Sequence, residues 1–365
     1  MKYDVYSLGQ LVNIKYGKNQ KKVQSITGTI PIYGTGGLMG YATEALYNKP
    51  SVLIGRKGTI NKVRYVDHPF WTVDTLFYTE VNESLVIPKY LYYVMSLIDL
   101  GLYNEGTTIP SLRTETLNRL ELNIPDLENQ KKVLSVLEPI DQKINTNDKI
   151  NENLQQQAFA FFDRLMIKAD NNDCTVSDYA SLNPRRALAK NQIARSIDMS
   201  QLSTNGAFPS GWEMKPFNGG MRFTNGDTLL ARITPCLENG KTAFIDFLDD
   251  DEVAFGSTEY IVLAPKNDVP PEMLYCLARY PAFVDYAVKN MNGSSGRQRV
   301  SAEIIGQFRL PKFEGQSLLK FGEAVTPMFL KMRYNSLENI RLAELRDTLL
   351  PKLMSGEINV SDIQL

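Results

Sequence analysis

Two stretches of the chain place apolar residues three and four positions apart, with polar residues between them. The first stretch includes Ile140, Ile144 and Leu165, and this periodicity predicts an amphipathic helix. The apolar stripe is narrow, which is typical of a coiled-coil seam rather than of a helix on a large core. We interpret Pro139 as a break or as the first turn of the helix, which is then expected to continue to Met166.

The second stretch repeats the first one. The displacement that places Val133 on Phe321 also places Leu137, Pro139, Ile140, Ile144, Asn147, Asn151 and Leu154 on Val325, Pro327, Met328, Met332, Asn335, Asn339 and Leu342. Asn147 and Asn151 fall on the seam, where a buried asparagine can fix the register of two helices. We expect the two helices to pack on each other, because neither can bury its stripe alone. Two separate bundle helices are the alternative.

Shorter matches extend the duplication upstream. They pair Leu8–Leu11 with Val176–Tyr179, Ile87–Tyr92 with Pro270–Tyr275, and Ile124-Pro125 with Leu310-Pro311. The second copy is longer near its start. The duplication predicts five segments: globular domains over 1–125 and 169–311, spacer helices over 126–168 and 312–356, and a tail over 357–365. The first domain is expected to begin directly at Met1.

The globular segments have the pattern of a mixed α/β (α+β) fold. Short β-rich runs over Ser51–Gly55, Phe70–Val73 and Tyr260–Leu263 are bounded by Gly, Pro, Asn and Asp, which is typical of strands. Each domain is then expected to carry one helix, Lys89–Ile98 or Glu272–Arg279, before a final short strand. The fold predicted from the pattern is two pseudo-symmetric globular domains and two long coiled-coil helices.

Composition narrows the classes of function. The 365 residues include 40 Lys and Arg against 41 Asp and Glu, so no overall field attracts a polyanion and any such site must be local. The three cysteines are far apart and lack zinc-ligand spacing, so we expect reduced thiols in a cytoplasmic protein. The N-terminus lacks the pattern of a signal peptide, and no apolar run is long enough to span a membrane.

The residue types present in the chain exclude most catalytic templates. His68 is the only histidine of the chain, so a histidine triad or a multi-histidine metal site cannot form. Gly240-Lys241-Thr242 lacks the first glycine of a phosphate-binding loop, and we interpret it as a strand or turn fragment. The run Gly34–Gly40 has Met39 where a dinucleotide fingerprint needs its third glycine, so a turn-rich loop is expected. No catalytic residue, metal or cofactor is predicted.

Cations and small polar residues recur at equivalent places in the two copies. Each copy has a cation directly after a β-rich run and a Gly/Ser/Thr loop further on, and Arg and Gln on such a loop suit bidentate reading of base edges. The candidate residues are Arg56, Lys57, Thr107, Thr108, Ser111 and Arg113 in the first copy, and Arg232, Ser294, Ser295, Arg297, Gln298 and Arg299 in the second. A further cationic cluster includes Arg186 and Arg195, and the acidic run over 249–252 is expected to be a solvated loop.

The order of these parts resembles the specificity (S) subunit of type I DNA restriction-modification systems. The resemblance covers essentially the whole chain and rests on Pro31–Gly37, Leu53–Thr59, Gly106–Leu112, Asn292–Gln298 and Leu345–Glu357 together with the duplicated helix. It implies two target-recognition domains, each reading one half of a bipartite, asymmetric site in double-stranded DNA. They are separated by an antiparallel pair of long helices that docks two methyltransferase (M) subunits.

The resemblance also implies that restriction (R) subunits complete the complex and that catalysis lies on the partner subunits. No membrane and no small-molecule substrate are expected as partners. Three alternatives stay open: a methylation-only system without R subunits, a coiled-coil adaptor whose globular domains bind peptides, and a single-chain modification enzyme.

Overall fold

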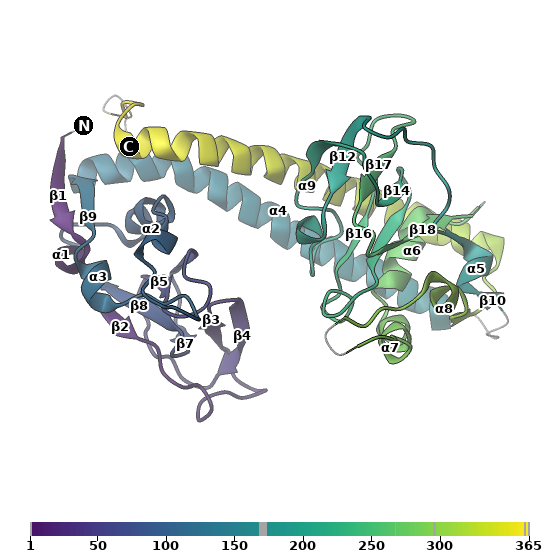
Figure 1. The fold of residues 1–365 in the computed structure, drawn as a ribbon, viewed down its shortest axis with the longest axis horizontal. Helices are drawn as coiled ribbons and strands as arrows, with labels where there is room; N and C mark the ends of the chain where they lie inside the picture. The colour runs from purple at the N-terminus through teal and green to yellow at the C-terminus, as the bar shows by residue number, and fades with distance from the viewer. Residues whose placement is uncertain (1, 168–173, 267, 295–296, 361–362, 364–365) are drawn as a thin grey trace. The chain divides into compact units, whose positions relative to one another are not determined.

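The computed structural model describes residues 2–167, 174–266, 268–294, 297–360 and 363. The chain divides into two compact units (Figure 1). Unit 1 comprises Met1–Asp141 and Glu344–Leu365, and unit 2 comprises Gln142–Ala343. Each unit therefore contains a globular part and a portion of both long helices. The five segment boundaries expected from the sequence stay predictions.

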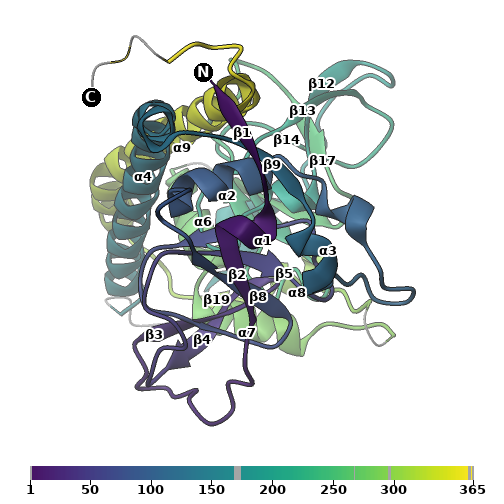
Figure 2. The same cartoon turned by 90° about the vertical axis from the view of Figure 1, so that its left-hand side faces the viewer.

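Unit 1 is built on three small sheets. The first has the strand order β2-β8-β5-β6, with bounds Val12–Tyr16, Leu76–Val81, Ser51–Gly55 and Val63–Val66. The second has the order β4-β3-β7, with bounds Gly37–Ala42, Ile30–Gly34 and Trp71–Thr72. The third pairs β1 (Tyr3–Ser7) with β9 (Glu121–Pro125), which lie side by side in Figure 2. The short helices are α1 (Leu8–Leu11), α2 (Pro88–Ser96), η1 (Leu100–Tyr103) and α3 (Thr114–Asn118).

Unit 2 repeats this plan. Its first sheet has the order β11-β18-β15-β16, with bounds Ala180–Leu182, Tyr260–Pro265, Thr228–Ala231 and Thr242–Phe244. Its second has the order β13-β12-β17-β14, with bounds Glu213–Pro216, Ile193–Ile197, Ala254–Gly256 and Met221–Phe223. Its third pairs β10 (Cys174–Thr175) with β19 (Arg309–Leu310). The helices are α5 (Val176–Tyr179), η2 (Met199–Gln201), α6 (Pro271–Ala278), α7 (Pro281–Lys289) and α8 (Ala302–Gly306).

Local sequence signals explain several repeated elements. The one-turn helices α1 and α5 both begin with a capping box, formed by Ser7 with Gln10 and by Thr175 with Asp178. Helices α2 and α6 both begin with proline in the first turn, where a missing N–H costs nothing. The weakest match found in the sequence, Leu8–Leu11 on Val176–Tyr179, is thus confirmed as a pair of equivalent helices.

Two helices of 41 residues, α4 (Leu127–Ile167) and α9 (Gly315–Ser355), run side by side (Figures 1 and 2). In unit 2, Asn147 donates to Asn339 Oδ1 at 2.9 Å, and Asn335 donates to Asn151 Oδ1 at 2.8 Å. The partners follow opposite orders along the two helices, so the helices are antiparallel. The expected seam of paired asparagines is confirmed, with Asn147 and Asn335 both buried.

Two expectations about the helices are wrong. Pro139 and Pro327 neither break nor begin a helix, because α4 and α9 continue for more than a turn on both sides of them. Both prolines are exposed, so water can reach the carbonyl that loses its backbone donor. Unit 2 also has α7 in addition to α6, although one such helix was expected in each domain.

The principal core of each unit forms where its globular part packs on the long helices. In unit 1, α2 contributes the buried Tyr90 and Leu91, and the long helices contribute Val133 and Leu350. In unit 2, helix α6 is buried along its whole length. It shares its core with residues of both long helices. The stripes on α4 and α9 are therefore covered by the globular parts as well as by the other helix.

Candidate nucleic-acid interface

In each unit, the loop that follows the third strand of the first sheet lies beside a second loop from later in the chain. In unit 1, Leu112 N donates to Arg56 O at 3.0 Å, and Gly58 N donates to Pro110 O at 2.9 Å. In unit 2, Val300 N donates to Arg232 O at 3.0 Å, and Thr234 N donates to Gln298 O at 3.1 Å. The same two backbone hydrogen bonds thus join the same two loops in both units. The described candidate residues of both copies lie on these loop pairs.

In unit 1, the side chains of the two candidate cations after β5 differ in whether they already bind protein groups. Arg56 donates from Nη1 to Asp74 O at 2.8 Å, and its guanidinium lies 5.0 Å from the ring centroid of Tyr16. Lys57 is exposed and forms an isolated β-bridge with Ser111. The structure therefore brings Arg56, Lys57 and Ser111 together but uses the Arg56 side chain to hold the loop.

The second loop of unit 1 is closed by its own polar groups. Asn104 Oδ1 accepts from Gly106 N and from Ser111 N, each at 2.9 Å. A Cβ on Gly106 would lie 1.9 Å from Ile109 O, so only glycine fits this tight turn. The tip of the loop, including Thr107 and Thr108, is exposed.

Arg113 lies at the far end of this loop. Its Nε is 3.0 Å from Glu105 Oε2, but 70% of its side chain remains exposed. An exposed ion pair of this kind contributes little free energy. The guanidinium can therefore exchange Glu105 for a phosphate at small cost, so the structure leaves Arg113 accessible.

In unit 2, one carboxylate organises the candidate arginines. Glu259 accepts from Arg299 Nε at 3.0 and 2.9 Å and from Arg299 Nη2 at 2.6 Å. Arg232 Nε lies 3.7 Å from the same carboxylate. The hydrogen bonds from Arg299 hold the pKa of Glu259 below its usual range, so the carboxylate stays charged. Arg299 and Arg232 are thus anchored cations.

The remaining candidates of unit 2 lie on the outer part of the second loop. Ser294 and Arg297 are exposed, and Arg297 N donates to Ser294 O at 3.0 Å. Gln298 is partly exposed, and its backbone is hydrogen-bonded to Thr234. Ser295 lies outside the described residues. The Arg297 side chain is therefore the accessible guanidinium of this loop.

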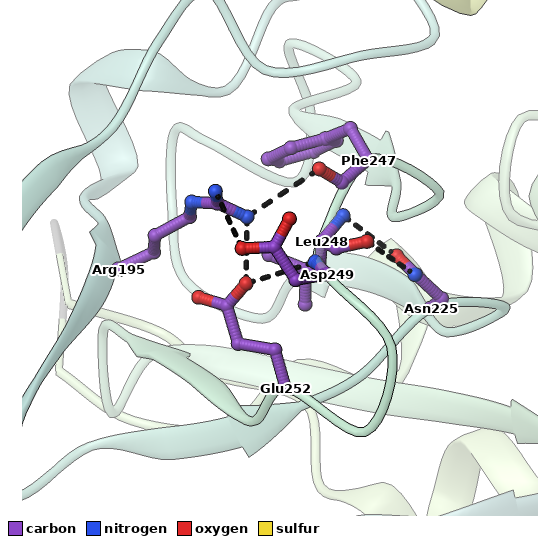
Figure 3. Close-up of polar contacts among 6 residues, drawn as sticks. All are labelled: Arg195, Asn225, Phe247, Leu248, Asp249 and Glu252. Atoms are coloured by element: carbon purple, nitrogen blue, oxygen red, sulfur yellow. Dashed lines mark hydrogen bonds and ion pairs between the residues drawn. The ribbon is translucent and has the colours of Figure 1, made fainter.

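The additional cationic cluster of unit 2 is structural. Arg195 pairs with Glu252 at 2.6 Å and Asp249 at 3.1 Å, and Figure 3 shows its guanidinium directed toward both carboxylates. Arg186 reaches both oxygens of the buried Asp227 at 2.6 Å. The expectation of a solvated acidic loop is wrong for Glu252, whose side chain is only 20% exposed. Arg186 and Arg195 are thus both neutralised by carboxylates of unit 2.

The sequence analysis did not predict a role for Glu259 or for Thr75, its equivalent in unit 1, each of which precedes the second strand of the first sheet. Arg56 N donates to Thr75 O at 2.8 Å, and Arg232 N donates to Glu259 O at 3.0 Å, so Thr75 and Glu259 are equivalent. The available signal was an isolated acidic residue just before the β-rich run Tyr260–Leu263.

In the described part of the chain, no group of three or more potential metal-ligating side chains occurs, and no helix is long and apolar enough to cross a bilayer. The run Gly34–Gly40 was expected to be a turn-rich loop, but only Thr35 and Gly36 form a turn, and the rest of the run belongs to the paired strands β3 and β4.

Comparisons with known proteins agree with this architecture. Residues 1–156 match the family model of the type I restriction modification DNA specificity domain. The chain is also 23% identical, over 79% of its length and 81% of the relative's, to the type I restriction enzyme HindI specificity subunit of Haemophilus influenzae. It is 23% identical to the MjaIX specificity subunit of Methanocaldococcus jannaschii, over 87% of this chain and 80% of that protein.

The fold agrees with the same group of specificity subunits. The S subunit of the type I restriction-modification system from M. genitalium superposes with a TM-score of 0.60 at 17% identity, over 97% of this chain and 96% of that one. The resemblance to type I specificity subunits stated from the sequence is therefore confirmed. The fold class is confirmed as well, with two pseudo-symmetric units and two long antiparallel helices.

Proposed function

We propose that the chain is the non-catalytic DNA-recognition subunit of a type I restriction-modification complex. The observation that carries the proposal is the loop pair built twice with the same backbone hydrogen bonds and different side chains. A scaffold that repeats while its exposed side chains change is suited to reading two different short sequences. Each unit then reads one half of a bipartite, asymmetric site in double-stranded DNA.

The accessible and anchored side chains take different roles in this proposal. Exposed or partly exposed groups on the paired loops reach base edges or phosphates, because direct readout requires donors that are free to enter a groove. They are Lys57, Thr107, Thr108, Arg113, Ser294, Arg297 and Gln298. Arg56, Ser111, Arg232 and Arg299 hold the loops in place, since their side chains or backbones already bind protein groups. Ser295 keeps the role inferred from the sequence.

Selection from a random duplex library tests DNA recognition directly. The chain, purified with its M subunits, is expected to enrich two short blocks separated by unspecified base pairs, and binding should weaken as salt rises. Enrichment of no sequence, or of a single uninterrupted block, would contradict recognition by two separate units. The chain purified alone is expected to transfer no methyl groups and to cleave no DNA.

The M subunits are proposed to dock on the long helices. In unit 2, an exposed apolar stripe follows one face of α9 and comprises Leu319, Leu330 and Tyr334, of which Leu319 and Tyr334 are about 60% exposed. Exposed apolar rows on a helix mark interaction surfaces. The matching positions of α4 are the polar Lys131, Gln142 and Thr146. The stripe thus accounts for one of the two expected M subunits.

Charge introduced into the stripe tests this docking. The double variant Leu330→Asp and Tyr334→Asp is expected to lose at least about tenfold in affinity for M, because desolvating unpaired carboxylates in an apolar interface is costly. A control is available on α4, where Gln156→Asp places one exposed charge outside the stripe. Normal M binding by the double variant would exclude the stripe as the docking surface.

R subunits are proposed to join through the complex, which acts in the cytoplasm.

A further inference from the structure

Unit 1 contains a cavity of about 400 Å³ whose lining includes Asn61 and Lys62 of the β5–β6 loop but none of the candidate DNA-binding residues described above. It is bounded by the β5–β6 hairpin, by α2 and by the β3–β4 turn. Its polar and aromatic lining includes Thr35, Asn61, Lys62, Arg64, Tyr92 and Ser96. The volume lies within the range of small-molecule sites in proteins. Among the described residues, none that lines the cavity is acidic.

The charge of this cavity is not balanced by the protein. Lys89 also lines it, but its ammonium lies 3.2 Å from Asp141, which in turn pairs with Arg346 at 3.2 Å. Arg346 pairs with Asp347 at 2.8 Å, so these four groups neutralise one another. Lys62 and Arg64 form no ion pair within the described part of the chain.

The duplicated fold shows what occupies the matching place in unit 2. Strand register aligns Gly55 with Ala231, and it therefore aligns Tyr65 with Phe244 and Arg64 with Ala243. The helical repeat aligns Tyr92 with Tyr275 and Asp141 with Phe329. A cationic, tyrosine-lined cavity in unit 1 thus corresponds to a packed apolar cluster in unit 2.

An insertion fills this place in unit 2. Strands β3 and β4 are joined by the two residues Thr35 and Gly36, whereas the equivalent β12 and β13 are joined by residues 198–212. This insertion carries Phe208, whose ring lies 5.9 Å from Phe244 and 6.4 Å from Phe329. Phe208 is buried. The second copy therefore closes with its own aromatic ring a space that the first copy leaves open.

We propose that the open cavity of unit 1 binds a nucleoside monophosphate group. The planar base takes the place that Phe208 has in unit 2, beside Tyr65, because aromatic side chains bind bases by stacking. It stacks on the ring face opposite the Lys89 ammonium, which lies 4.7 Å from the Tyr65 centroid. The phosphate, which carries close to two negative charges at neutral pH in a free monophosphate and one in a nucleic acid, is neutralised by Lys62 and Arg64. The group can belong to a free nucleotide or to a nucleotide of a nucleic acid.

Titration of the full chain with adenosine 5′-monophosphate, in the absence of DNA, tests the pocket independently of the proposed function. Saturable binding is expected, with adenosine and inorganic phosphate each at least about tenfold weaker, since each lacks one half of the contacts. The double variant Lys62→Gln and Arg64→Gln should lose at least about tenfold in affinity for the monophosphate and little for adenosine. Lys22→Gln, which removes an exposed cation outside the cavity, should bind normally.

A steric variant separates the cavity from general charge attraction. Ser96 is exposed and lines the cavity, so Ser96→Trp should block it and abolish binding while leaving the net charge unchanged. No binding by the unmodified chain, or unchanged binding by Ser96→Trp, would overturn the proposal. Addition of target DNA then identifies the source of the ligand. Displacement of the monophosphate indicates a nucleotide of DNA, and simultaneous binding indicates a free nucleotide.

Discussion

Arg297 and Arg299 are two positions apart, and their environments give them different roles. Arg299 is held by Glu259 through three hydrogen bonds, whereas Arg297 is exposed and forms no ion pair among the described residues. A guanidinium whose donors are already used must lose that ion pair before it can bind a base. Base reading in unit 2 is therefore assigned to Arg297 and loop support to Arg299.

Truncation of Arg297 should affect one half of the DNA site. Arg297→Ala is expected to cost about 1–3 kcal/mol of binding free energy and to relax sequence preference in one block only. Competition binding with single-base variants of both blocks measures this. Lys312→Ala removes another exposed cation of unit 2 and should lower affinity without changing preference. Equal relaxation of both blocks by Arg297→Ala would contradict the assignment.

Neutralising Glu259 should have the opposite effect on non-specific DNA. In Glu259→Gln, Arg232 and Arg299 lose their charged partner, so affinity for unrelated duplex should rise by up to about fivefold, since such pairs are worth roughly 1 kcal/mol or less. Discrimination between target and unrelated DNA should fall, because the loop is less well held. Asp250→Asn makes the same charge change at an exposed site and is the control. Unchanged discrimination would show that Glu259 does not position the loop.

At this scale the sequence predicted residue types better than residue roles. The candidate cations do lie on paired loops, because a strand end and a Gly/Ser/Thr loop are local signals. Which of these cations are held by ion pairs was not predictable, since Glu259 is 40 positions from Arg299 and the pairing depends on sheet topology. The same reason explains Arg195, whose partners Asp249 and Glu252 are contributed by another part of unit 2.

Among the elements, the long helices depend on buried polar groups as well as apolar ones. Asn147 is 1% exposed and donates to Glu338 Oε2 at 2.7 Å and to Asn339 Oδ1 at 2.9 Å. Such a network favours one register, because sliding a helix leaves buried donors and acceptors without partners. The sequence showed this seam through the repeated asparagines, a signal that does not depend on tertiary contacts.

Removing this network should destabilise unit 2. Asn147→Ala is expected to lower the free energy of unfolding by about 1–3 kcal/mol, since it removes the two hydrogen bonds that the buried Asn147 side chain donates to the other long helix. Urea denaturation followed by circular dichroism measures the change. Asn145→Ala, at an exposed position of the same helix, should have little effect. Equal stability of the two variants would show that the asparagine pair is not a determinant of helix packing.

Helix bounds were less predictable than helix pairing. Proline is a strong local breaking signal, and it led to the expectation that the helix breaks or begins at Pro139, whereas α4 runs through this residue from Leu127 to Ile167. The long helices tolerate the proline because it is exposed and because packing on the globular part stabilises the turns before it. Tertiary packing of this kind cannot be read from a local pattern.

Across the whole molecule, the duplication is the feature that the sequence predicted best. Matching apolar positions revealed two copies, and the structure has the same strand order in the first sheet of each. The differences between the copies were not predictable in detail. The insertion over residues 198–212 was apparent only as extra length, and its role in filling a cavity depends on where Phe208 packs.

Modular recognition is tested by exchanging one domain. Replacing residues 1–125 with the corresponding segment of a related specificity subunit should change one block of the DNA site and leave the other intact, since each loop pair is contained within one unit. Binding selection on the purified complex measures both blocks. A chimera that changes both blocks, or neither, would contradict independent reading by the two units.

DNA recognition by two separate units is tested by sequencing the methylated bases in the genome of cells that express this chain with its M subunits. Methylation is expected within one asymmetric site of two short blocks separated by unspecified base pairs, and it should be lost when the chain is deleted. Arg297→Ala is expected to broaden the bases accepted in one block alone. Methylation of a continuous palindrome, or a pattern that persists without this chain, would contradict the account.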